Sequence, residues 1–395
     1  MVVIQDPHLK KQDGYHVYEA FKTEDLFVHS ADGKDFEGDC WPGRSLWPDF
    51  TVEKARSVWS SLQSYSRHTG TTPNLYIWND MNEPSVFDHA EMTMPRDALH
   101  ADGVEHRDIH NMYGMLMVMA TFKGLQDRRD AATMTSARRP FILSRSFYAG
   151  MQRYGAIWTG DNRADWSHLK CSIPMLLTTS VCGFVFSGAD VGGFFGDPEP
   201  ALLARWYQLG AWTPFFRAHA HIDSPRREPY LMQEPYRGII IEAIRERYRF
   251  MPLWYTLFMQ SHFSGAPMMR PMWSIFPSDH VARVLEEQFM LGKTMLVAPV
   301  LESNANEKRV YLPGTHKEVK FRSQLILRCK KITEMKYPVV SVARSTWANR
   351  RSRKLDRWHL DHCTSKHIPS TFIYTKRFHN TLATSRAQVV PIDAL

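Results

Sequence analysis

An alternation of short apolar runs and helical stretches is the feature of this sequence that most constrains its fold. Each apolar run ends at a polar or charged residue, and stretches with helical spacing separate the runs. The runs occupy residues 75–78, 141–143, 156–158, 181–186, 214–216 and 267–269. Short apolar runs separated by helices are typical of buried strands in a parallel sheet. The alternation therefore predicts an α/β fold.

The same pattern fits either a barrel or a doubly wound sheet. No Gly-x-Gly-x-x-Gly motif follows a predicted strand, which disfavours a dinucleotide site. In a (β/α) barrel, residues at the carboxyl ends of the strands meet on one face. We therefore expect a set of polar residues that follow the runs to converge there: Asp80, Arg145, Asp161, Asp190 and His219.

The character of the chain changes twice after the last of these runs. We predict that the alternating region ends at residue 278, and that residues 279–316 begin a β-sheet domain, with strands at 288–300 and 310–312. Residues 317–395 contain no glycine, although the whole chain has 21. Because β domains need glycine in their turns, we expect this last segment to be a poor candidate for packed β structure and to be disordered.

Charge is divided unevenly along the chain. The formal net charge is +8, but residues 317–395 hold 17 Lys and Arg against 5 Asp and Glu, which is +12. The first 316 residues hold the remaining 32 basic and 36 acidic groups, which is −4. The basic tail leaves a nucleic-acid-binding tail open as an alternative, with a solvated tail favoured. A whole-chain argument for nucleic-acid binding is excluded.

Other function classes are disfavoured by what the sequence lacks. It contains no apolar run long enough to span a membrane, and its first residues lack the basic and apolar regions expected of a signal peptide. Its five cysteines are widely spaced without a Cys-x-x-Cys pair. His219, His221 and Asp223 share a strand-like spacing, and His359, His362, Cys363 and His367 cluster in the tail, but neither group has a convincing metal-ligand pattern. We predict no metal and no cofactor.

Two of the strand-end carboxylates suit the hydrolysis of a glycosidic bond. A retaining glycosidase needs one ionised carboxylate and one carboxylic acid about 5 Å apart. Asp80 follows Trp78, and Asp161 follows Trp158 closely. Tryptophan beside each carboxylate is sensible because sugar rings bury apolar faces on aromatic rings. Arg145 and His219 could hold sugar hydroxyl groups.

Several motifs in order resemble those of glycoside hydrolase family 31. Residues 78–87 (Trp-Asn-Asp-Met-Asn-Glu-Pro-Ser-Val-Phe) resemble the nucleophile signature of that family, and residues 158–162 (Trp-Thr-Gly-Asp-Asn) resemble its acid/base signature. Residues 188–194 and 216–221 match two further blocks. Residues 38–43 and 226–229 are similar to the neutral α-glucosidase branch, which contains the catalytic subunits of endoplasmic-reticulum glucosidase II.

The resemblance implies a role for individual residues. Asp80 matches the nucleophile, and Asp161 matches the acid/base. Glu83 matches a motif carboxylate counted with the active site, which we interpret as orienting it. The remaining matches bind the glucose of the scissile bond or line its subsite: Arg145, His219, Trp41, Trp78, Trp158 and Phe194. Asp190 is grouped with these substrate-binding candidates, but a structural role, holding a loop under the site, is the favoured interpretation.

The resemblance also implies a function and a setting. It implies a retaining exo-α-glucosidase that acts on terminal α-linked glucose of N-glycans or oligosaccharides in the endoplasmic-reticulum lumen, with a non-catalytic glucosidase II β-like subunit as partner. It covers about residues 4–314, so we expect a partial (β/α)8 barrel, truncated at both ends, over residues 1–278 and a tail of non-family sequence. An inactive fragment or gene-model artefact with residual carbohydrate binding stays open as an alternative.

Overall fold

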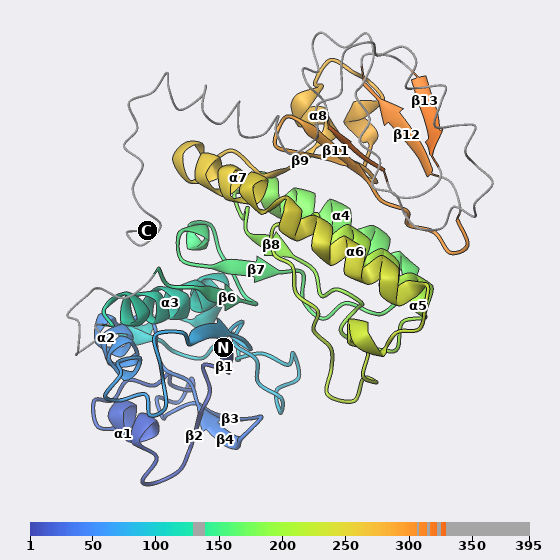
Figure 1. Ribbon diagram of the computed structural model, residues 1–395. Coiled ribbons are helices and arrows are strands. Elements are labelled where there is room, and N and C mark those ends of the chain that lie inside the picture. The colour runs from blue at the N-terminus through green and yellow to red at the C-terminus, as the bar shows by residue number, and fades with distance from the viewer. Residues whose placement is uncertain (129–138, 306–307, 314–316, 322–324, 329–395) are drawn as a thin grey trace. The chain divides into compact units, whose positions relative to one another are not determined.

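The computed structural model describes residues 1–128, 139–305, 308–313, 317–321 and 325–328 (Figure 1). Within this part of the chain, five strands form one parallel sheet in the order of the sequence. They are β1 (Val2–Gln5), β5 (Tyr76–Asn79), β6 (Ile142–Ser144), β7 (Ala156–Trp158) and β8 (Ser187–Gly188). Neighbouring strands in sequence order, joined through helices, are the arrangement of a barrel wall. The predicted α/β class and partial barrel are confirmed.

Helices follow the strands on one face of this sheet. They are α3 (His106–Gln126) after β5, α4 (Trp166–Val181) after β7 and α5 (Pro200–Gly210) after β8. Ile77, Ile142 and Ile157 pack together with residues of α3. Trp78, Leu143 and Trp158, one position further along, pack in a separate cluster. Because successive side chains of a strand point to opposite faces, the tryptophans beside the two motif carboxylates lie on the face away from α3.

A smaller layer is inserted between β1 and β5. It contains β2 (Leu9–Lys10), α1 (His16–Lys22), β3 (Glu37–Cys40), β4 (Gly43–Leu46) and α2 (Glu53–Leu62), with the strands antiparallel in the order β2-β4-β3. Its core contains the fully buried rings of Phe21, Trp47 and Phe50. The indole N–H of Trp59 in α2 donates to Thr121 Oγ1 of α3 at 2.8 Å. That bond joins the insertion to the barrel wall.

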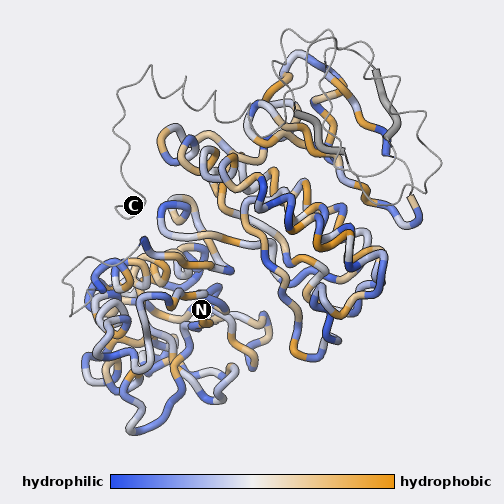
Figure 2. The backbone as a smooth tube through the Cα atoms, in the orientation of Figure 1, coloured by the Kyte–Doolittle hydropathy of each residue, from blue (hydrophilic) through white to orange (hydrophobic). Residues whose placement is uncertain are grey.

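The helical stretch between the apolar runs at 214–216 and 267–269 contains two successive long helices. α6 (Tyr236–Arg249) ends at Phe250, and α7 (Met251–Ser264) begins there. Pro252 lacks an N–H and cannot continue the hydrogen-bond ladder of α6, but it fits the first turn of a new helix. Figure 2 shows polar and apolar positions alternating along α5 and α6. Their apolar sides join α4 and α7 in one core cluster.

Two other predicted strands differ in the structure. Residue 181 ends α4, Gly183 follows with a left-handed φ of 96°, and the strand is confined to β8. Residues 214–216 form no ladder, although the Phe215 N–H donates to the Ser187 carbonyl at 3.0 Å. An isolated parallel bridge between Asp190 and Arg217 follows. This segment therefore runs beside β8 without becoming a regular strand.

An antiparallel β module follows α7. β9 (Met269–Pro271), β10 (Phe289–Leu291), β11 (Met295–Ala298) and β14 (Leu325–Arg328) form a sheet in the order β14-β11-β10-β9, and β12 (Lys308–Leu312) pairs with β13 (Lys317–Phe321). β13 and β14 lie in the glycine-free segment, which its lack of glycine makes a poor candidate for packed β structure. Antiparallel pairing with β11 and β12 supplies the backbone partners that they need.

The remaining short helices are α8 (Met272–Ile275), η1 (Ala101–Gly103), η2 (Met151–Arg153), η3 (Pro229–Leu231) and η4 (Ala282–Val284). None of the helices in the described ranges is both long enough and apolar enough to cross a bilayer. The predicted domain boundaries at residues 278 and 316 stay predictions. The His/Cys group of the tail and residues 329–395 of the basic tail lie outside the described residues.

Candidate active site

The strand ends bring two loops together at Arg145. Asn79 is the Cα partner of Ser144, so Asp80 and Arg145 directly follow paired positions of β5 and β6. Arg145 Nε lies 3.2 Å from Asp80 Oδ1. Nε also donates to Glu83 Oε1, and Nη2 donates to Glu83 Oε2, each at 2.8 Å. The guanidinium thus binds Glu83 with both arms while it contacts Asp80.

The loop after β5 has a tightly held backbone. Met81 has a left-handed φ of 52°, and its N–H donates to Asp80 Oδ1 at 2.9 Å. Asn82 is buried and connects to β6, because its amide nitrogen donates to Ser144 Oγ at 2.9 Å. A Cβ added to Gly114 of α3 would lie 2.6 Å from the Asn82 carbonyl oxygen. The helix thus needs glycine at this position to pack against the loop that carries Asp80.

Asp80 and Glu83 differ in protonation tendency. Burial raises the pKa of Asp80, and Arg145 partly opposes that effect. Burial also acts on Glu83, but the hydrogen bonds and charge of Arg145 outweigh it and leave the pKa of Glu83 below its usual range. The Arg145 pKa is raised because these carboxylates outweigh its burial. Glu83 is therefore an ionised anchor for Arg145, whereas Asp80 carries the less strongly compensated charge.

Asp161 has a more open setting three residues after β7. The residue is exposed, and no hydrogen bond or ion pair of its side chain occurs within the described ranges. Burial and the charge of Glu83 raise its pKa, while Arg145, Arg217 and His221 lower it. Asp80 and Asp161 also act on one another electrostatically. An accessible carboxyl with a raised pKa suits proton exchange with substrate and water.

Buried Asp190 pairs with partly buried Arg217, which lies against two tryptophans. Arg217 Nη2 lies 2.5 Å from Asp190 Oδ1, and only 1% of the Asp190 side chain is exposed. The guanidinium carbon lies 4.4 Å from the ring centre of Trp78 and 5.1 Å from that of Trp158. The two indoles meet edge to face at 5.2 Å. Asp190 thus fixes an arginine that supports both aromatic rings, and the Asp190 pKa rises to about 6 mainly through burial.

His219 lies against the aromatic group. Its ring is 5.1 Å from Trp78 and stacks on Phe194 at 5.4 Å. Burial and the charges of Arg217 and Arg227 lower its pKa to about 4, so the imidazole is neutral near pH 7. Arg227 donates to the His219 carbonyl at 3.1 Å and to the Gly192 carbonyl at 3.0 Å. One residue of the Arg-Arg-Glu-Pro motif therefore ties the Phe194 loop to the His219 segment.

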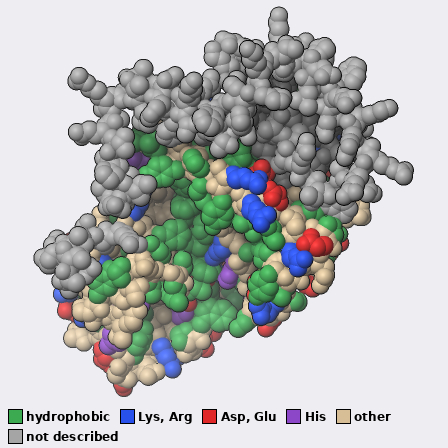
Figure 3. Space-filling view, in the orientation of Figure 1, with side chains coloured by type: hydrophobic (Ala, Val, Ile, Leu, Met, Phe, Trp, Pro, Cys, Tyr) green, Lys and Arg blue, Asp and Glu red, His purple; other side chains and the backbone are tan. Residues whose placement is uncertain are grey.

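Trp41 lies at the edge of the same region. It is 69% exposed, and its ring meets Phe87, at the end of the nucleophile motif, edge to face at 4.8 Å. Figure 3 shows hydrophobic side chains gathered over the middle of one face of the molecule. An exposed indole beside the motif is available to an apolar ligand face.

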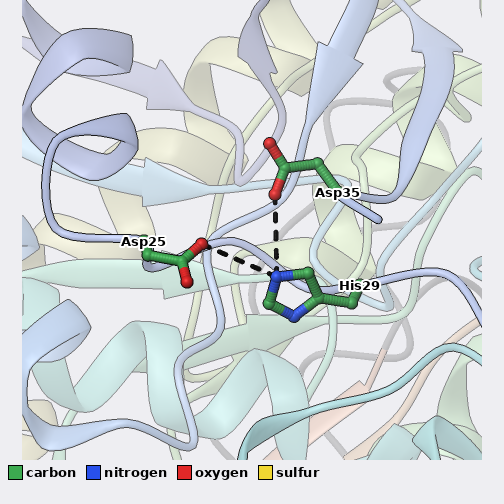
Figure 4. A group of neighbouring side chains, drawn as sticks. All are labelled: Asp25, His29 and Asp35. Atoms are coloured by element: carbon green, nitrogen blue, oxygen red, sulfur yellow. Dashed lines mark ion pairs between the residues drawn. The ribbon is translucent and has the colours of Figure 1, made fainter. Parts of the chain in front are cut away.

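The groups considered as metal ligands have other contacts. His221 Nδ1 lies 3.4 Å from Asp223 Oδ2, whereas His219 stacks on Phe194. Among the described residues, three other side chains bring metal-donor atoms within 4.8 Å of one another, namely Asp25, His29 and Asp35 (Figure 4). His29 Nε2 lies 3.6 Å from Asp25 and 3.7 Å from Asp35. Two exposed carboxylates around an imidazole are explained by ion pairing, so we assign this cluster no role.

Sequence reasoning missed three groups near the site. Asp6 follows β1 and is influenced by the charges of Asp80 and Arg145. Like the predicted site residues, it is a polar residue that follows a short apolar run, so the same pattern could have identified it. Arg217 lies within residues 216–221, a block that resembles the family, but nothing in the sequence marks it out from its neighbours. A buried hydrogen-bonded chain, whose members are far apart in sequence, had no signal that reasoning could use: Asp49, His100, His106 and His110.

Comparison with known proteins agrees with this architecture. Residues 1–257 match the model of the glycosyl hydrolases family 31 TIM-barrel domain, and residues 265–347 match the family 31 C-terminal domain. Neutral alpha-glucosidase AB of Mus musculus is 52% identical over 314 residues, which cover 80% of this chain and 33% of that protein. A probable glucan 1,3-alpha-glucosidase of Oryza sativa subsp. japonica is 52% identical over 80% of this chain and 34% of its own length.

The solved structures lead to the same family. A glucosidase II alpha subunit, described as bound to alpha3-Glc2, superposes with a TM-score of 0.76 at 46% identity and covers 82% of this chain and 36% of that chain. The chain therefore belongs to glycoside hydrolase family 31. It spans about a third of the length of the curated relatives named here.

Proposed function

We propose that this chain is the catalytic barrel of a retaining exo-α-glucosidase that removes terminal α-linked glucose from oligosaccharides or N-glycans. The observation that carries the proposal is the pair of motif carboxylates after β5 and β7, the two strands that flank β6, in unlike settings. Asp80 contacts Arg145, whereas Asp161 is exposed and has a raised pKa. Unlike settings for two carboxyl groups are what separate a nucleophile from an acid.

The reaction follows from these settings in two steps. In the first, an oxygen of Asp80 bonds to C1 of glucose while the glycosidic C1–O bond breaks, and Asp161 gives its proton to the leaving oxygen. In the second, Asp161 takes a proton from water, whose oxygen bonds to C1 and releases Asp80. A separation of about 5 Å between the carboxyl groups is required for this course, and it stays a prediction.

The surrounding side chains have separate tasks in this proposal. Glu83 holds Arg145 against Asp80 through the paired 2.8 Å hydrogen bonds. Trp78, Trp158 and Phe194 supply apolar faces for the glucose ring. Neutral His219 and the free face of Arg145 bind hydroxyl groups, and Trp41 borders the subsite. Asp190 acts indirectly, because its ion pair holds Arg217 against the two indole rings.

The relatives support a setting as well as a reaction. One solved relative is described as an endoplasmic-reticulum glucosidase II complex of the catalytic subunit with the binding domain of a regulatory subunit, and it matches with a TM-score of 0.79. We propose the lumen of the endoplasmic reticulum as the compartment and a regulatory β-like subunit as the partner. Co-purification with such a subunit tests the partner.

Release of 4-nitrophenol from its α-glucoside tests the function. Asp80→Asn should lower kcat/KM by at least about 10³-fold because no covalent bond to C1 can form. Asp161→Ala should give a burst of nitrophenol followed by slow turnover, since the activated leaving group needs little protonation but water still needs a base. Asp32→Asn, a surface carboxylate paired with Lys34, is the matched control and should leave the rate unchanged.

The outcomes separate the proposal from the inactive-fragment alternative. A cooperatively folded preparation that releases no nitrophenol contradicts the proposal, as does activity unchanged in Asp80→Asn. Product with inverted configuration at C1, observed by NMR before mutarotation, would contradict the retaining course alone.

A further inference from the structure

Asp6 is the lateral neighbour of Asp80. It directly follows β1, whose last residue, Gln5, is the Cα partner of Asn79 in β5. The Asn79 amide donates to the Gln5 carbonyl at 3.3 Å and holds the two strand ends together. Adjacent strands lie about 4.8 Å apart. The residues that follow the paired positions therefore start side by side at the same edge of the sheet.

Asp6 has no cation of its own. Its Oδ2 lies 3.5 Å from His8 Nε2, and within the described ranges its buried Oδ1 has no hydrogen-bond partner. His8 is almost fully buried, and that burial lowers its pKa to about 4, so the imidazole is neutral near pH 7. The nearby Cys40 thiol of β3 is also neutral, because burial raises its pKa to about 11.

The guanidinium of Arg145 is already shared by two carboxylates. It lies 3.2 Å from Asp80 and 2.8 Å from Glu83. Asp80, Glu83 and Arg145 together carry one net negative charge when all are ionised. An ionised Asp6 would add a second negative charge at a largely buried place without a donor for Oδ1, which is strongly unfavourable.

We propose that Asp6 is a positioning residue of the active site: it keeps its proton while Asp80 and Glu83 are ionised, and so leaves Arg145 to them. Its role in catalysis rests on the function proposed above, whereas its protonation does not. Burial and the charges of Asp80 and Glu83 raise the pKa of Asp6 to about 7 against the opposing effect of Arg145, which agrees with the contacts.

Protein stability tests the protonation without any assay of activity. The folded chain binds a proton at Asp6 up to about pH 7, whereas the unfolded chain releases it near pH 4. The folded state binds more protons in this window, so Asp6 lowers the stability progressively as pH rises from 4 to 7. Asp6→Asn has no such effect. We expect the Tm of Asp6→Asn, relative to the native chain, to increase between pH 5 and pH 8.

Asp13→Asn is the matched control, because Asp13 is an exposed carboxylate beside Lys22. Its Tm relative to the native chain should change little between the same two pH values. A Tm difference for Asp6→Asn that is as insensitive to pH as that of Asp13→Asn overturns the proposal. If Asp6→Asn does not fold, Asp6→Ser provides a small neutral donor for the same comparison.

The pH profile of kcat/KM tests the positioning role. In the native chain, both Asp161 and Asp6 must be protonated, so activity should fall on the alkaline side with two ionisations. Asp6→Asn should keep activity within about threefold at pH 6 and lose one of these two ionisations. Asp6→Ala should lose more activity than Asp6→Asn. If Asp6→Asn and Asp6→Ala lose equal activity, and the alkaline side of the kcat/KM profile is unchanged, then Asp6 is not a positioning residue. That conclusion holds even if the stability test shows that Asp6 is protonated.

Discussion

At the scale of single residues, Arg145 is the side chain that connects several polar groups of the site. It reaches Asp80, both oxygens of Glu83 and, at 3.2 Å, Ser85 Oγ. The planar guanidinium suits this because it presents several donors in a fixed fork. The arrangement also explains why Glu83 belongs to the motif although it lies apart from the proposed attack. Glu83 neutralises part of the charge on Arg145, the cation that holds Asp80 in place.

We predict that Arg145→Lys damages both stability and activity. A lysine ammonium can replace one contact but not the fork, which leaves a partly buried carboxylate under-compensated. We expect a loss of about 2 kcal/mol in the free energy of unfolding. Denaturant titration measures that loss. An exposed counterpart, Arg96→Lys beside Glu91, serves as control and should be nearly neutral; equal effects at both positions would contradict the prediction.

At the scale of elements, a chain of imidazoles anchors the start of α3 to the insertion. Asp49 Oδ1 lies 2.7 Å from His100 Nδ1, His100 Nε2 lies 2.9 Å from His106 Nδ1, and His106 Nε2 lies 2.8 Å from His110 Nδ1. Gly114, one turn further along α3, touches the Asn82 loop. The chain of contacts therefore runs from a buried carboxylate of the insertion to the helix that supports the loop carrying Asp80.

The middle imidazole should make stability sensitive to acid. Burial and the charges of His100 and His110 lower the His106 pKa to about 3, against about 6.5 in an unfolded chain. The unfolded state binds more protons between these values, so the contribution of His106 to stability is lost as pH falls below about 6.5. His106→Gln should therefore lower Tm more at pH 7.5 than at pH 5.

His16→Gln, at the exposed start of α1, is the control for that measurement. Its small effect on Tm should be the same at both pH values. Should His106→Gln cost as much at pH 5 as at pH 7.5, the imidazole would not be held neutral in the folded chain.

At the scale of the whole molecule, the site is assembled from loops that span most of the barrel region. Its side chains follow β1, β5, β6, β7 and β8, and the segment that bridges to Asp190 adds Arg217 and His219. A ligand that contacts several of these loops binds only the folded arrangement. Binding should therefore stabilise the chain as a whole.

We predict that 1-deoxynojirimycin, a glucose-like iminosugar, raises the Tm of the native chain. At a hundred times its Kd the stabilisation is about 2.7 kcal/mol, which corresponds to a rise of a few degrees. Asp80→Asn should reduce the shift because the cationic iminosugar loses an anionic partner, while Asp32→Asn should retain it. A native chain whose melting is unaffected by saturating iminosugar would support the inactive-fragment alternative.

Much of the sheet follows from local patterns. Residues 75–78, 141–143 and 156–158 are apolar, short and bounded by polar residues, and they form β5, β6 and β7 nearly as expected. The helices between them also follow from periodicity. The prediction of a strand over residues 181–186 was wrong, because a short apolar run is compatible with the end of a helix as well as with a strand. The strands β13 and β14 have no clear signal in the glycine-free segment, because strand pairing depends on partners elsewhere in the chain.

The sequence by itself determined which residues are chemically suited to the site, since carboxylates and tryptophans at the ends of apolar runs are visible in one dimension. Only the tertiary structure decided how charge is shared among them. Arg145 binds Glu83 as well as Asp80, Asp190 binds Arg217, and Asp6 is left without a cation. Proton affinity depends on burial and on charges brought near in space, and neither can be read from spacing along the chain.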